Sequence, residues 1–428
     1  MVQKMRKMKD SGIEWIGEIP EGWEVIKAKY LFAQRNEKGN SALVLLSPTQ
    51  KYGVIPQSQL EGVVQVKENT DLRVFKTIHI GDFVISLRSF QGGFEFSNYE
   101  GVCSPAYQVF HATKDLSNDF FRYLFKSDGF ISKINSLTVG IREGKNIQYW
   151  DFSNMLLALP PKEVQIRSAQ YLNAKCTEID TILSKTRSSI EEYKKLKQAV
   201  ITQAVTKGVR GKRKMKDREV EWIGEIPKEW GQTKIKMVAS FFNGDRTSRY
   251  PQPTDFVDNG IAFLTSRNID GDEVDLSDVK YITERKYNSL SGAKIQINDI
   301  VFCLRGSVGK CAINQTLSCG TVASSLATIR PNCVYPKYLL YFLLSDIAST
   351  QTAVFMNGTC AANLSAENVA NYYITLPLST EQKEIAAYLD AKCAEIDGLI
   401  AKKEQLVKEL ESYKKSLIYE VVTGKREV

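Results

Sequence analysis

Short polar segments that combine arginine, lysine, asparagine, glutamine and aromatic residues recur along this chain of 428 residues. They follow or separate the apolar runs typical of strands, and they lie at 47–54, 88–93, 140–146, 243–253, 265–272 and 305–310. An arginine side chain can donate two hydrogen bonds to guanine, asparagine and glutamine can do so to adenine, and lysine can bind phosphate. These segments therefore predict a DNA-contacting surface, with these candidate residues: Thr49, Gln50, Lys51, Tyr52, Arg88, Gln91, Arg142, Lys145, Arg246, Ser248, Arg249, Tyr250, Arg267, Asn268, Arg305, Ser307 and Lys310.

Each of these side chains also has a simpler interpretation, because a single exposed arginine or lysine is more often a solvated surface residue. Arg88 and Arg305 favour a DNA contact, since each follows a predicted strand and precedes a glycine-rich turn. The basic stretches at 4–9 and 210–216 favour solubilising linkers, with phosphate contact as their alternative.

The sequence offers no catalytic constellation. The segment RGSVGK lacks the GxxxxGK[ST] spacing of a phosphate loop, and Cys311 follows its lysine where serine or threonine would bind Mg²⁺. The chain contains no glycine-rich fingerprint for S-adenosylmethionine and no NPPY or DPPY tetrapeptide, which a base methyltransferase should have. The two histidines, His79 and His111, both stand in the first half, which excludes histidine-rich metal sites and a credible catalytic triad. We therefore expect a chain that binds no cofactor or metal and has no catalytic site of its own.

Composition favours an ordinary globular protein with a mild excess of base. Hydrophobic residues make up 43% of the chain, charged residues 25%, and the formal net charge of +8 is compatible with DNA binding. The eight cysteines show no CxxC pair, which favours buried thiols in a reducing compartment over disulfides. The sequence has no run of eighteen apolar residues and no apolar signal-peptide core at its start, so we expect a cytoplasmic protein.

An internal duplication determines the expected architecture. The segment MKDSGIEWIGEIPEGWE near the N-terminus returns as MKDREVEWIGEIPKEWG, and Trp222 follows Trp15 by 207 positions. Further on, QYLNAKCTEID returns as AYLDAKCAEID at an offset of 217, and GDFVISLRSFQGG aligns with NDIVFCLRGSVGK at that same offset. Between these anchors the copies diverge almost completely. The chain is thus predicted to hold two tandem copies of one fold with different surfaces, and the repeated tryptophans are predicted to be packing anchors.

The ends of the two copies match as well. The C-terminal segment VVTGKREV echoes AVTKGVRGKRKMKD, which leads from the first copy into the second. The repeat is therefore circular in its order, and we expect the two ends of the chain to lie close to each other.

Two long stretches predict helices that pair as an antiparallel coiled coil. From Ala169 the apolar or neutral positions recur in alternating steps of three and four, and the same register returns from Ala386. Each stretch begins after a proline, contains none inside, and ends near Gly208 or Gly424. Amphipathic helices that pack only on their own domains are the alternative, which the shared register disfavours. The polar interruptions of the seam predict solvated edges or register-setting positions: Thr186, Lys197, Lys403 and Lys414.

The remaining segments alternate short apolar runs such as DFVISL and DIVFCL with amphipathic stretches, so the fold class is α+β. Each copy is predicted to consist of a mixed α/β domain followed by a long helix. The expected boundaries are 1–160 for the first domain, 161–208 for the first helix, 209–376 for the second domain and 377–428 for the second helix.

Taken together, these features resemble the specificity subunits of type I restriction-modification enzymes over nearly the whole chain. The resemblance rests on the EWIGEIP segments, the LPP or LPL junctions into helices reading YLxAKCxEID, the helix ends AVTKG and VVTGK, and the run from DIVFCLRGSVGK to VASSLATIRP. It implies that each mixed domain is a target recognition domain reading one part of a bipartite, asymmetric DNA site. It also implies that the helices set the gap between the two parts.

The resemblance further implies the partners and their cofactors. The helices would dock two methyltransferase (modification) subunits, which bind S-adenosylmethionine and methylate adenine, and the assembly would recruit restriction subunits that use ATP and Mg²⁺. This chain would bind double-stranded DNA and no membrane, and would contribute specificity without catalysis. The alternatives are a fused methyltransferase or nuclease, which the missing cofactor motifs disfavour, and a coiled-coil scaffold without DNA recognition, which the divergent domains disfavour.

Overall fold

The chain folds into two compact units, each of which takes one half of both long helices. The computed structural model describes residues 6–39, 42–60, 71–86, 93–137, 147–216, 223–269, 271–356 and 364–428. Unit 1 comprises residues 1–186 and 405–428, and unit 2 comprises residues 187–404. The expected boundaries separate domains from helices, whereas the compact units divide inside the helices. The reason is packing, because each globular fold buries its apolar side against the helix halves of its own unit.

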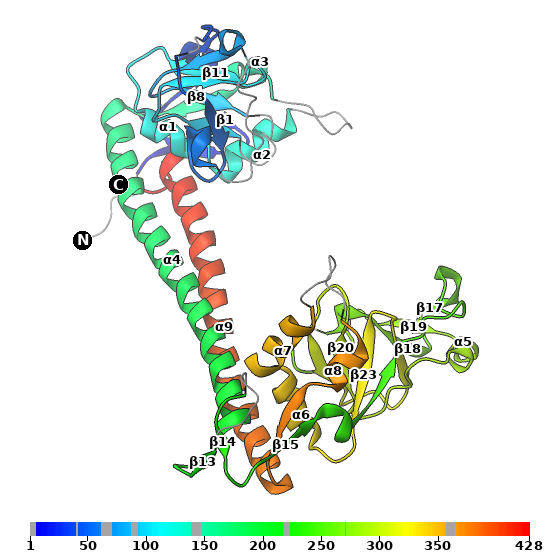
Figure 1. Ribbon diagram of the computed structural model, residues 1–428. Helices are drawn as coiled ribbons and strands as arrows, with labels where there is room; N and C mark the ends of the chain where they lie inside the picture. The colour runs from blue at the N-terminus through cyan, green and yellow to red at the C-terminus, as the bar shows by residue number, and fades with distance from the viewer. Residues whose placement is uncertain are drawn as a thin grey trace. The chain divides into compact units, whose positions relative to one another are not determined.

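A four-stranded antiparallel sheet forms the centre of unit 1 (Figure 1). Its order is β4-β11-β8-β9, so its first strand in chain order pairs with its last. Phenylalanines join this sheet to the helices, as in the edge-on contact of Phe32 and Phe121, whose ring centroids lie 5.1 Å apart. The elements of the unit are β1 (Met8–Ile13), β2 (Gly17–Pro20), β3 (Glu24–Lys27), β4 (Phe32–Arg35), β5 (Leu46–Thr49), β6 (Gly53–Pro56), β7 (Lys76–Ile78), β8 (Phe83–Ile85), β9 (Phe94–Phe96), β10 (Gly101–Cys103), β11 (Gln108–Ala112), α1 (Asn118–Leu124), α2 (Asp128–Ser136), α3 (Tyr149–Ser153) and β12 (Leu156–Leu159).

Unit 2 repeats the central sheet in the order β16-β23-β20-β21. The prediction that the divergent copies share a fold is thus confirmed. A second sheet, β17-β19-β18-β22, includes a parallel pair, β18 with β22. The elements are β13 (Met215–Lys216), β14 (Ile226–Pro227), β15 (Gly231–Lys234), β16 (Ala239–Asn243), β17 (Phe256–Val257), β18 (Ile261–Leu264), β19 (Lys280–Ile282), α5 (Glu284–Ser289), β20 (Ile300–Cys303), β21 (Cys311–Ile313), β22 (Gly320–Val322), β23 (Leu326–Pro331), α6 (Pro336–Leu343), α7 (Asp346–Met356), α8 (Ala366–Ala370) and β24 (Tyr373–Leu376).

Helix α6 contributes buried side chains to the core of unit 2, including Tyr338 and Phe342. Within the described ranges, no single helix has the length and apolar character needed to cross a membrane, and only α6 and α7 taken together, bent by 58°, reach that length and composition.

The two long helices are α4 (Lys162–Lys207) and α9 (Ser379–Val422), which begin one and two residues after the predicted starts. The predicted seam is the buried stripe of both helices. Leu172 and Leu417 are buried in unit 1, and Ala204 and Leu389 are buried in unit 2. The expected antiparallel pairing is confirmed, since within each unit the first part of one helix lies against the last part of the other (Figure 1).

Seam lysines fix the register of this pairing. In unit 1 the Nζ atom of Lys414 lies 2.6 Å from Oδ1 of Asp180, and in unit 2 Nζ of Lys197 lies 2.6 Å from Oδ2 of Asp397. The residue numbers of either pair sum to 594, so both pairs obey one antiparallel register. Two of the predicted polar interruptions are therefore register-setting ion pairs.

Each long helix starts on the same glutamine anchor. The Gln165 amide donates to Pro160 O at 2.9 Å and accepts from Ser117 N at 2.9 Å. In unit 2 the Gln382 amide donates to Pro377 O at 2.9 Å and accepts from the N–H of Tyr335 at 2.7 Å. The buried glutamine thus ties each helix start to the segment that precedes it and to the globular fold.

The circular order of the repeat has a structural counterpart. The Tyr419 hydroxyl of α9 lies 3.2 Å from Trp15 O, and Gly424 follows α9 with φ of 74°. A Cβ atom at Gly424 would come within 2.4 Å of Pro20, so glycine permits this close approach. In unit 2, Gly208 has φ of 75° after α4 and lies against Trp230 in the same way. The C-terminal helix end therefore contacts the first repeat, whereas residues 1–5, at the N-terminal end of the chain, lie outside the described residues.

A buried aspartate immediately precedes β8 in unit 1 and β20 in unit 2, at corresponding positions. Asp82 accepts from Arg35 Nε at 2.7 Å, and Asp299 accepts from Arg330 Nε at 2.8 Å. Asp299 also accepts from the N–H of Gln296 at 2.8 Å. The two arginines come from different strands, β4 in unit 1 and β23 in unit 2, so the ion pair recurs although its sequence positions do not.

We expect Asp299→Ala to destabilise unit 2 by about 3 kcal/mol, because it leaves the half-buried Arg330 guanidinium without its counter-charge. The measurement is the denaturant-unfolding midpoint, with hydrogen exchange of the β20 and β23 amides to locate the loss. Exposed Asp258 provides the control, since Asp258→Ala should change little. Equal effects of the two variants would contradict this assignment.

Candidate nucleic-acid interface

One predicted cluster lies on the loop that follows β16 in unit 2. Arg246, Ser248 and Arg249 are all exposed there, between Gly244 and the 3-10 turn at Pro253–Asp255. Tyr250 closes the loop differently, because its ring packs edge-on against Phe263 at a centroid distance of 5.8 Å. The loop thus presents two guanidinium groups and a hydroxyl to solvent and uses its tyrosine as an internal anchor.

A second cluster lies at the β20–β21 connection of the same unit. Arg305, Ser307 and Lys310 are exposed, and Gly306 and Gly309 take φ of 77° and 89°. The ends of the connection are fixed by the backbone bond from Cys303 N to Lys310 O at 2.8 Å. Positive φ favours glycine, so the two glycines let a short turn carry its polar side chains outward. The corresponding residues of unit 1, Arg88 and Gln91, lie outside the described residues, as do Arg142 and Lys145.

The remaining candidates of unit 1 form the β5–β6 hairpin turn. Gln50, Lys51 and Tyr52 are exposed, and Nζ of Lys51 lies 4.9 Å from the centroid of the Tyr52 ring. Thr49 has a structural part in the turn, since its hydroxyl donates to Gly53 O at 2.9 Å and accepts from the N–H of Tyr52 at 3.0 Å. The hairpin therefore presents a cation, an amide and an aromatic ring on a turn that Thr49 holds.

This hairpin borders a groove of 410 Å³ that is rich in cations. Four cationic side chains line it, against the two carboxylates of Glu95 and Asp180: Lys51, Arg122, Lys126 and Lys414. At its base Lys126 pairs with the buried Glu95, with 2.6 Å between Nζ and Oε1, while Oε2 of Glu95 has no hydrogen-bond partner among the residues that the structure describes. Burial raises the pKa of Glu95, and the Lys126 ammonium opposes that rise.

The corresponding groove of unit 2 has the opposite charge. It measures 280 Å³, and four carboxylates line it, against one cation: Asp272, Glu273, Asp390 and Asp397, with Lys337. Both grooves share one hydrogen bond at their base, Tyr123 to Asn173 at 2.8 Å in unit 1 and Tyr341 to Asp390 at 2.7 Å in unit 2. Burial, with Asp390 beside the hydroxyl, raises the pKa of Tyr341. The shared frame therefore carries charges that suit nucleic acid in unit 1 only.

Sequence reasoning did not single out Arg122 and Lys126. They stand four residues apart at the end of α1, a spacing that brings two cations to one side of a helical turn. That spacing was the available signal. Their place at the groove depends on α1 packing between β9 and α4, where Arg122 also donates to Asn173 at 2.7 Å, which no local pattern records.

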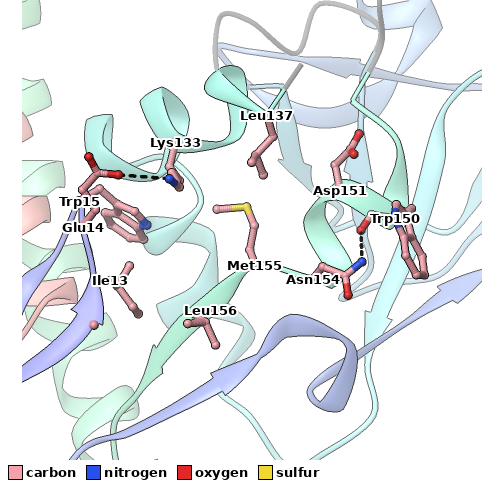
Figure 2. A pocket seen from close by; sticks show the side chains of 11 residues that line it. Ile13, Glu14, Trp15, Lys133, Leu137, Trp150, Asp151, Asn154, Met155 and Leu156 are labelled. Atoms are coloured by element: carbon pink, nitrogen blue, oxygen red, sulfur yellow. Dashed lines mark hydrogen bonds and ion pairs between the residues drawn. The ribbon is translucent and has the colours of Figure 1, made fainter. Parts of the chain in front are cut away.

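A pocket of 510 Å³ in unit 1 is lined mainly by apolar side chains, as Figure 2 shows. Trp15 and Met155 border it, and Trp150 stands at its edge with 72% of its surface exposed. Trp15 packs edge-on against Phe130 at 6.2 Å, in keeping with its predicted anchoring role. In unit 2 the position of Met155 is taken by Tyr372, which belongs to the fully buried core.

Asn268 corrects one prediction. Its side chain is 2% exposed and completes a capping box, accepting from Thr265 N at 2.9 Å and donating to Asp275 O at 3.0 Å. The amide has no free edge for a base, because its hydrogen-bonding atoms serve the loop after β18. Arg267, the preceding residue, is exposed and keeps its predicted place on the surface.

Among the described residues there is no group of three or more histidine, cysteine, aspartate or glutamate side chains that could hold a metal ion.

We expect Asn268→Ala to destabilise unit 2 by about 1–3 kcal/mol, because it removes the hydrogen bonds of a buried amide. Arg267→Ala is the matched control and should leave the thermal unfolding temperature unchanged. Differential scanning calorimetry of both variants tests the assignment. A stable Asn268→Ala chain would return Asn268 to the candidates for ligand contact.

Comparison with known proteins shows what this chain is similar to. Residues 227–409 match the family model described as Type I restriction modification DNA specificity domain. The MjaVIII specificity subunit of a type I restriction enzyme from Methanocaldococcus jannaschii is 24% identical over 423 residues, which cover 95% of this chain and 93% of that protein. The EcoBI specificity subunit from Escherichia coli is 24% identical over 301 residues, covering 66% of this chain and 62% of that subunit.

Solved structures show the same fold. A chain from a structure described as "Structural basis underlying complex assembly and conformational transition of the type I R-M system" has a TM-score of 0.74 at 16% identity and covers 95% of this chain and 99% of its own. The HsdS subunit from Thermoanaerobacter tengcongensis has a TM-score of 0.52 at 16% identity, with 95% and 98% covered. Along nearly its whole length the chain is thus similar to the specificity subunits of type I restriction enzymes, and it shares their fold.

Proposed function

We propose that this chain is the non-catalytic specificity subunit of a type I restriction-modification enzyme, and that each unit reads one part of a bipartite, asymmetric DNA site. The observation that carries the proposal is the pair of central sheets with one strand order and different polar loops. A conserved frame with divergent exposed loops suits a protein whose two halves read different sequences. Because the loops differ, the two parts of the site should differ.

The exposed side chains of each unit supply the chemistry that base reading needs. Unit 2 offers Arg246, Arg249 and Arg305, each able to donate two hydrogen bonds to guanine in the major groove. Unit 1 offers the amide of Gln50, which can pair with adenine, and Lys51, which suits phosphate. A mismatch at a contacted base pair is expected to cost about 1–3 kcal/mol.

The two long helices are proposed to set the gap and to carry the methyltransferase subunits. Exposed apolar residues support the docking part of this proposal, because they recur at the repeat offset. In unit 1, Ile182 is 40% exposed and Tyr413 is 47% exposed. Their counterparts in unit 2, at the offset of 217, are Leu399 for Ile182 and Leu196 for Tyr413, which are 36% and 48% exposed. One apolar pair per unit suits two copies of the same partner. We call these the unit 1 pair and the unit 2 pair.

Cofactors belong to the partners in this proposal. The modification subunits would bind S-adenosylmethionine and methylate adenine, and restriction subunits would use ATP and Mg²⁺. The chain itself would contact double-stranded DNA and position these subunits on it, in the cytoplasm.

The decisive experiment is co-expression of this chain with its neighbouring modification subunit, followed by genome-wide mapping of methylated adenines by single-molecule sequencing. We expect one split motif with a fixed gap, present only when the chain is co-expressed. Methylation that is unchanged without the chain would refute the specificity role and favour a scaffold. Methyl transfer by the isolated chain would instead indicate a fused enzyme.

The docking role predicts a change in stoichiometry. Replacing the unit 2 pair, as Leu196→Asp with Leu399→Asp, should reduce the bound modification subunits from two to one, since burying a charge in an apolar contact is costly. Native mass spectrometry of the purified complex measures this ratio. The exposed Leu378→Asp variant is the control, because Leu378 is 70% exposed and lies outside both pairs. Two bound subunits in the double variant would place the docking surface elsewhere.

A further inference from the structure

An inserted segment of unit 2 carries several of the exposed arginines away from the central sheet. The chain leaves the sheet after β16, forms β17, β18, β19 and α5, and returns before β20. Two short segments thus join the insertion to the sheet. We call them the outgoing strand (residues 244–245) and the returning strand (residues 291–293), although neither is a β-strand. The contacts between these two strands determine the orientation of the loop at 246–250, which follows β16 and carries Arg246 and Arg249.

The outgoing and returning strands touch through their backbones. A Cβ atom at Gly292 would come within 2.3 Å of Asp245 N, and one at Gly244 within 2.2 Å of Ala323 O. The N–H of Ala293 donates to Asn243 O at 2.8 Å directly beside this crossing. Glycine is therefore required at both positions, at Gly292 because of Asp245 and at Gly244 because of Ala323, which follows β22.

The Asp245 carboxylate clasps both strands at once. Its Oδ1 atom accepts from Thr247 N at 2.7 Å and from Thr247 Oγ1 at 2.6 Å, which shapes the outgoing loop. Its Oδ2 atom accepts from Ser291 N at 2.8 Å and from Ser291 Oγ at 3.0 Å, which holds the returning strand. Asp245 is 3% exposed. Although burial alone raises the pKa of Asp245, the hydrogen bonds from Thr247 and Ser291 outweigh it and hold the pKa well below its usual range.

The loop is fixed at its far end as well. The N–H of Tyr250 donates to Thr247 O at 3.1 Å, and the Tyr250 ring packs on Phe263 inside the insertion. Residues 246–249, between Asp245 and Tyr250, are all exposed, and they include Arg246 and Arg249. Because the arginines are exposed and their loop is bounded by Asp245 and Tyr250, their direction depends on the clasp.

Unit 1 joins the corresponding juncture through other contacts. There Thr77 N donates to Glu37 O at 2.9 Å, Thr77 Oγ1 donates to Lys38 O at 3.1 Å, and the exposed Glu37 carboxylate lies 3.0 Å from Nε2 of His79. Lys38 stands at the position of Asp245, counted with the offset of 207 that relates the tryptophans. The clasp is thus a property of unit 2, and its loss should affect that unit alone.

We propose that Asp245 is a positioning residue for DNA specificity: by clasping Thr247 and Ser291 it fixes the loop at 246–250 against the central sheet, and so determines which bases the half-site of unit 2 must contain. The inference rests on the proposed function and deepens it by naming the residue through which one half-site is selected. Asp245 itself touches no DNA in this account and acts through the exposed arginines.

The test is Asp245→Asn in the full chain, co-expressed with the modification subunit, with methylated adenines mapped genome-wide. The asparagine oxygen can still accept from Thr247, but its NH₂ group faces the donors of Ser291, so the returning strand is released. We expect one half of the split motif to degenerate, with the preference at its best-defined base pair reduced by about ten-fold or more. The other half of the motif and the gap should be unchanged.

The matched control is Asp275→Asn, since Asp275 caps a turn in the same unit by the same chemistry, accepting from Ser277 N at 2.8 Å and from its hydroxyl at 2.9 Å, away from the crossing. That variant should leave the motif intact. Loss of both halves together, or an unchanged motif in Asp245→Asn, would overturn the proposal. If the variant fails to fold, Ser291→Ala, which removes only the hydroxyl bond, should still degrade the same half of the motif to a lesser degree, and an unaltered motif there would also overturn it. Failure of the wild-type chain to direct any split motif would refute the proposed function itself.

Discussion

Burial of one apolar stripe from each long helix is the constraint on which both units depend. Each globular fold is incomplete without its helix halves, because Leu172 and Leu417 belong to the core of unit 1, and Ala204 and Leu389 to the core of unit 2. Fully burying one leucine side chain is worth about 1.5–3 kcal/mol. The helices are therefore parts of the two cores, and a slip of either helix would expose the stripe in the unit concerned. The seam ion pairs of Lys414 and Lys197 hold the same register by charge.

Because the long helices and the central sheets are fixed in this way, other residues can differ between the two units, provided that each buried carboxylate keeps a cation beside it. The buried aspartates Asp82 and Asp299 both need a counter-charge, and the guanidinium comes from β4 in one unit and from β23 in the other. Likewise the buried Glu95 of unit 1 pairs with Lys126, whereas unit 2 has the buried Ala312 at the corresponding position and needs no cation there. What recurs between the copies is a counter-charge beside a buried carboxylate, and the identity of the cation varies. This explains how two halves with little sequence in common can keep one strand order.

The parts of the structure that the sequence predicts well are those written in local patterns. The duplication, the seam and the helix limits follow from spacing and from proline and glycine punctuation, and the predicted helix starts lie within two residues of those of α4 and α9. The second sheet of unit 2 does not follow, because the parallel pairing of β18 with β22 joins segments far apart in the chain. For the candidate interface, loop composition identifies Arg246 and Arg249 correctly as exposed. It misplaces Asn268, since a polar residue in a loop can serve the backbone as readily as a ligand, and only the packed structure distinguishes the two.

Under the proposed function, the two units differ in where they offer positive charge to DNA. DNA carries a dense line of negative phosphates, so a surface that follows the backbone must be cationic. The groove of unit 1 meets this need with Lys51, Arg122, Lys126 and Lys414, whereas the equivalent groove of unit 2 is lined mostly by carboxylates. The two units therefore cannot grip phosphate through the same surface. In unit 2 that contact falls to cations on loops, such as Lys310 and the arginines beside Asp245, so there the same short loops must both hold the backbone and read the bases. A loop with both tasks needs a fixed direction more than one that is backed by a basic groove. This gives a physical reason for the buried Asp245 carboxylate in unit 2, at a position that Lys38 occupies in unit 1.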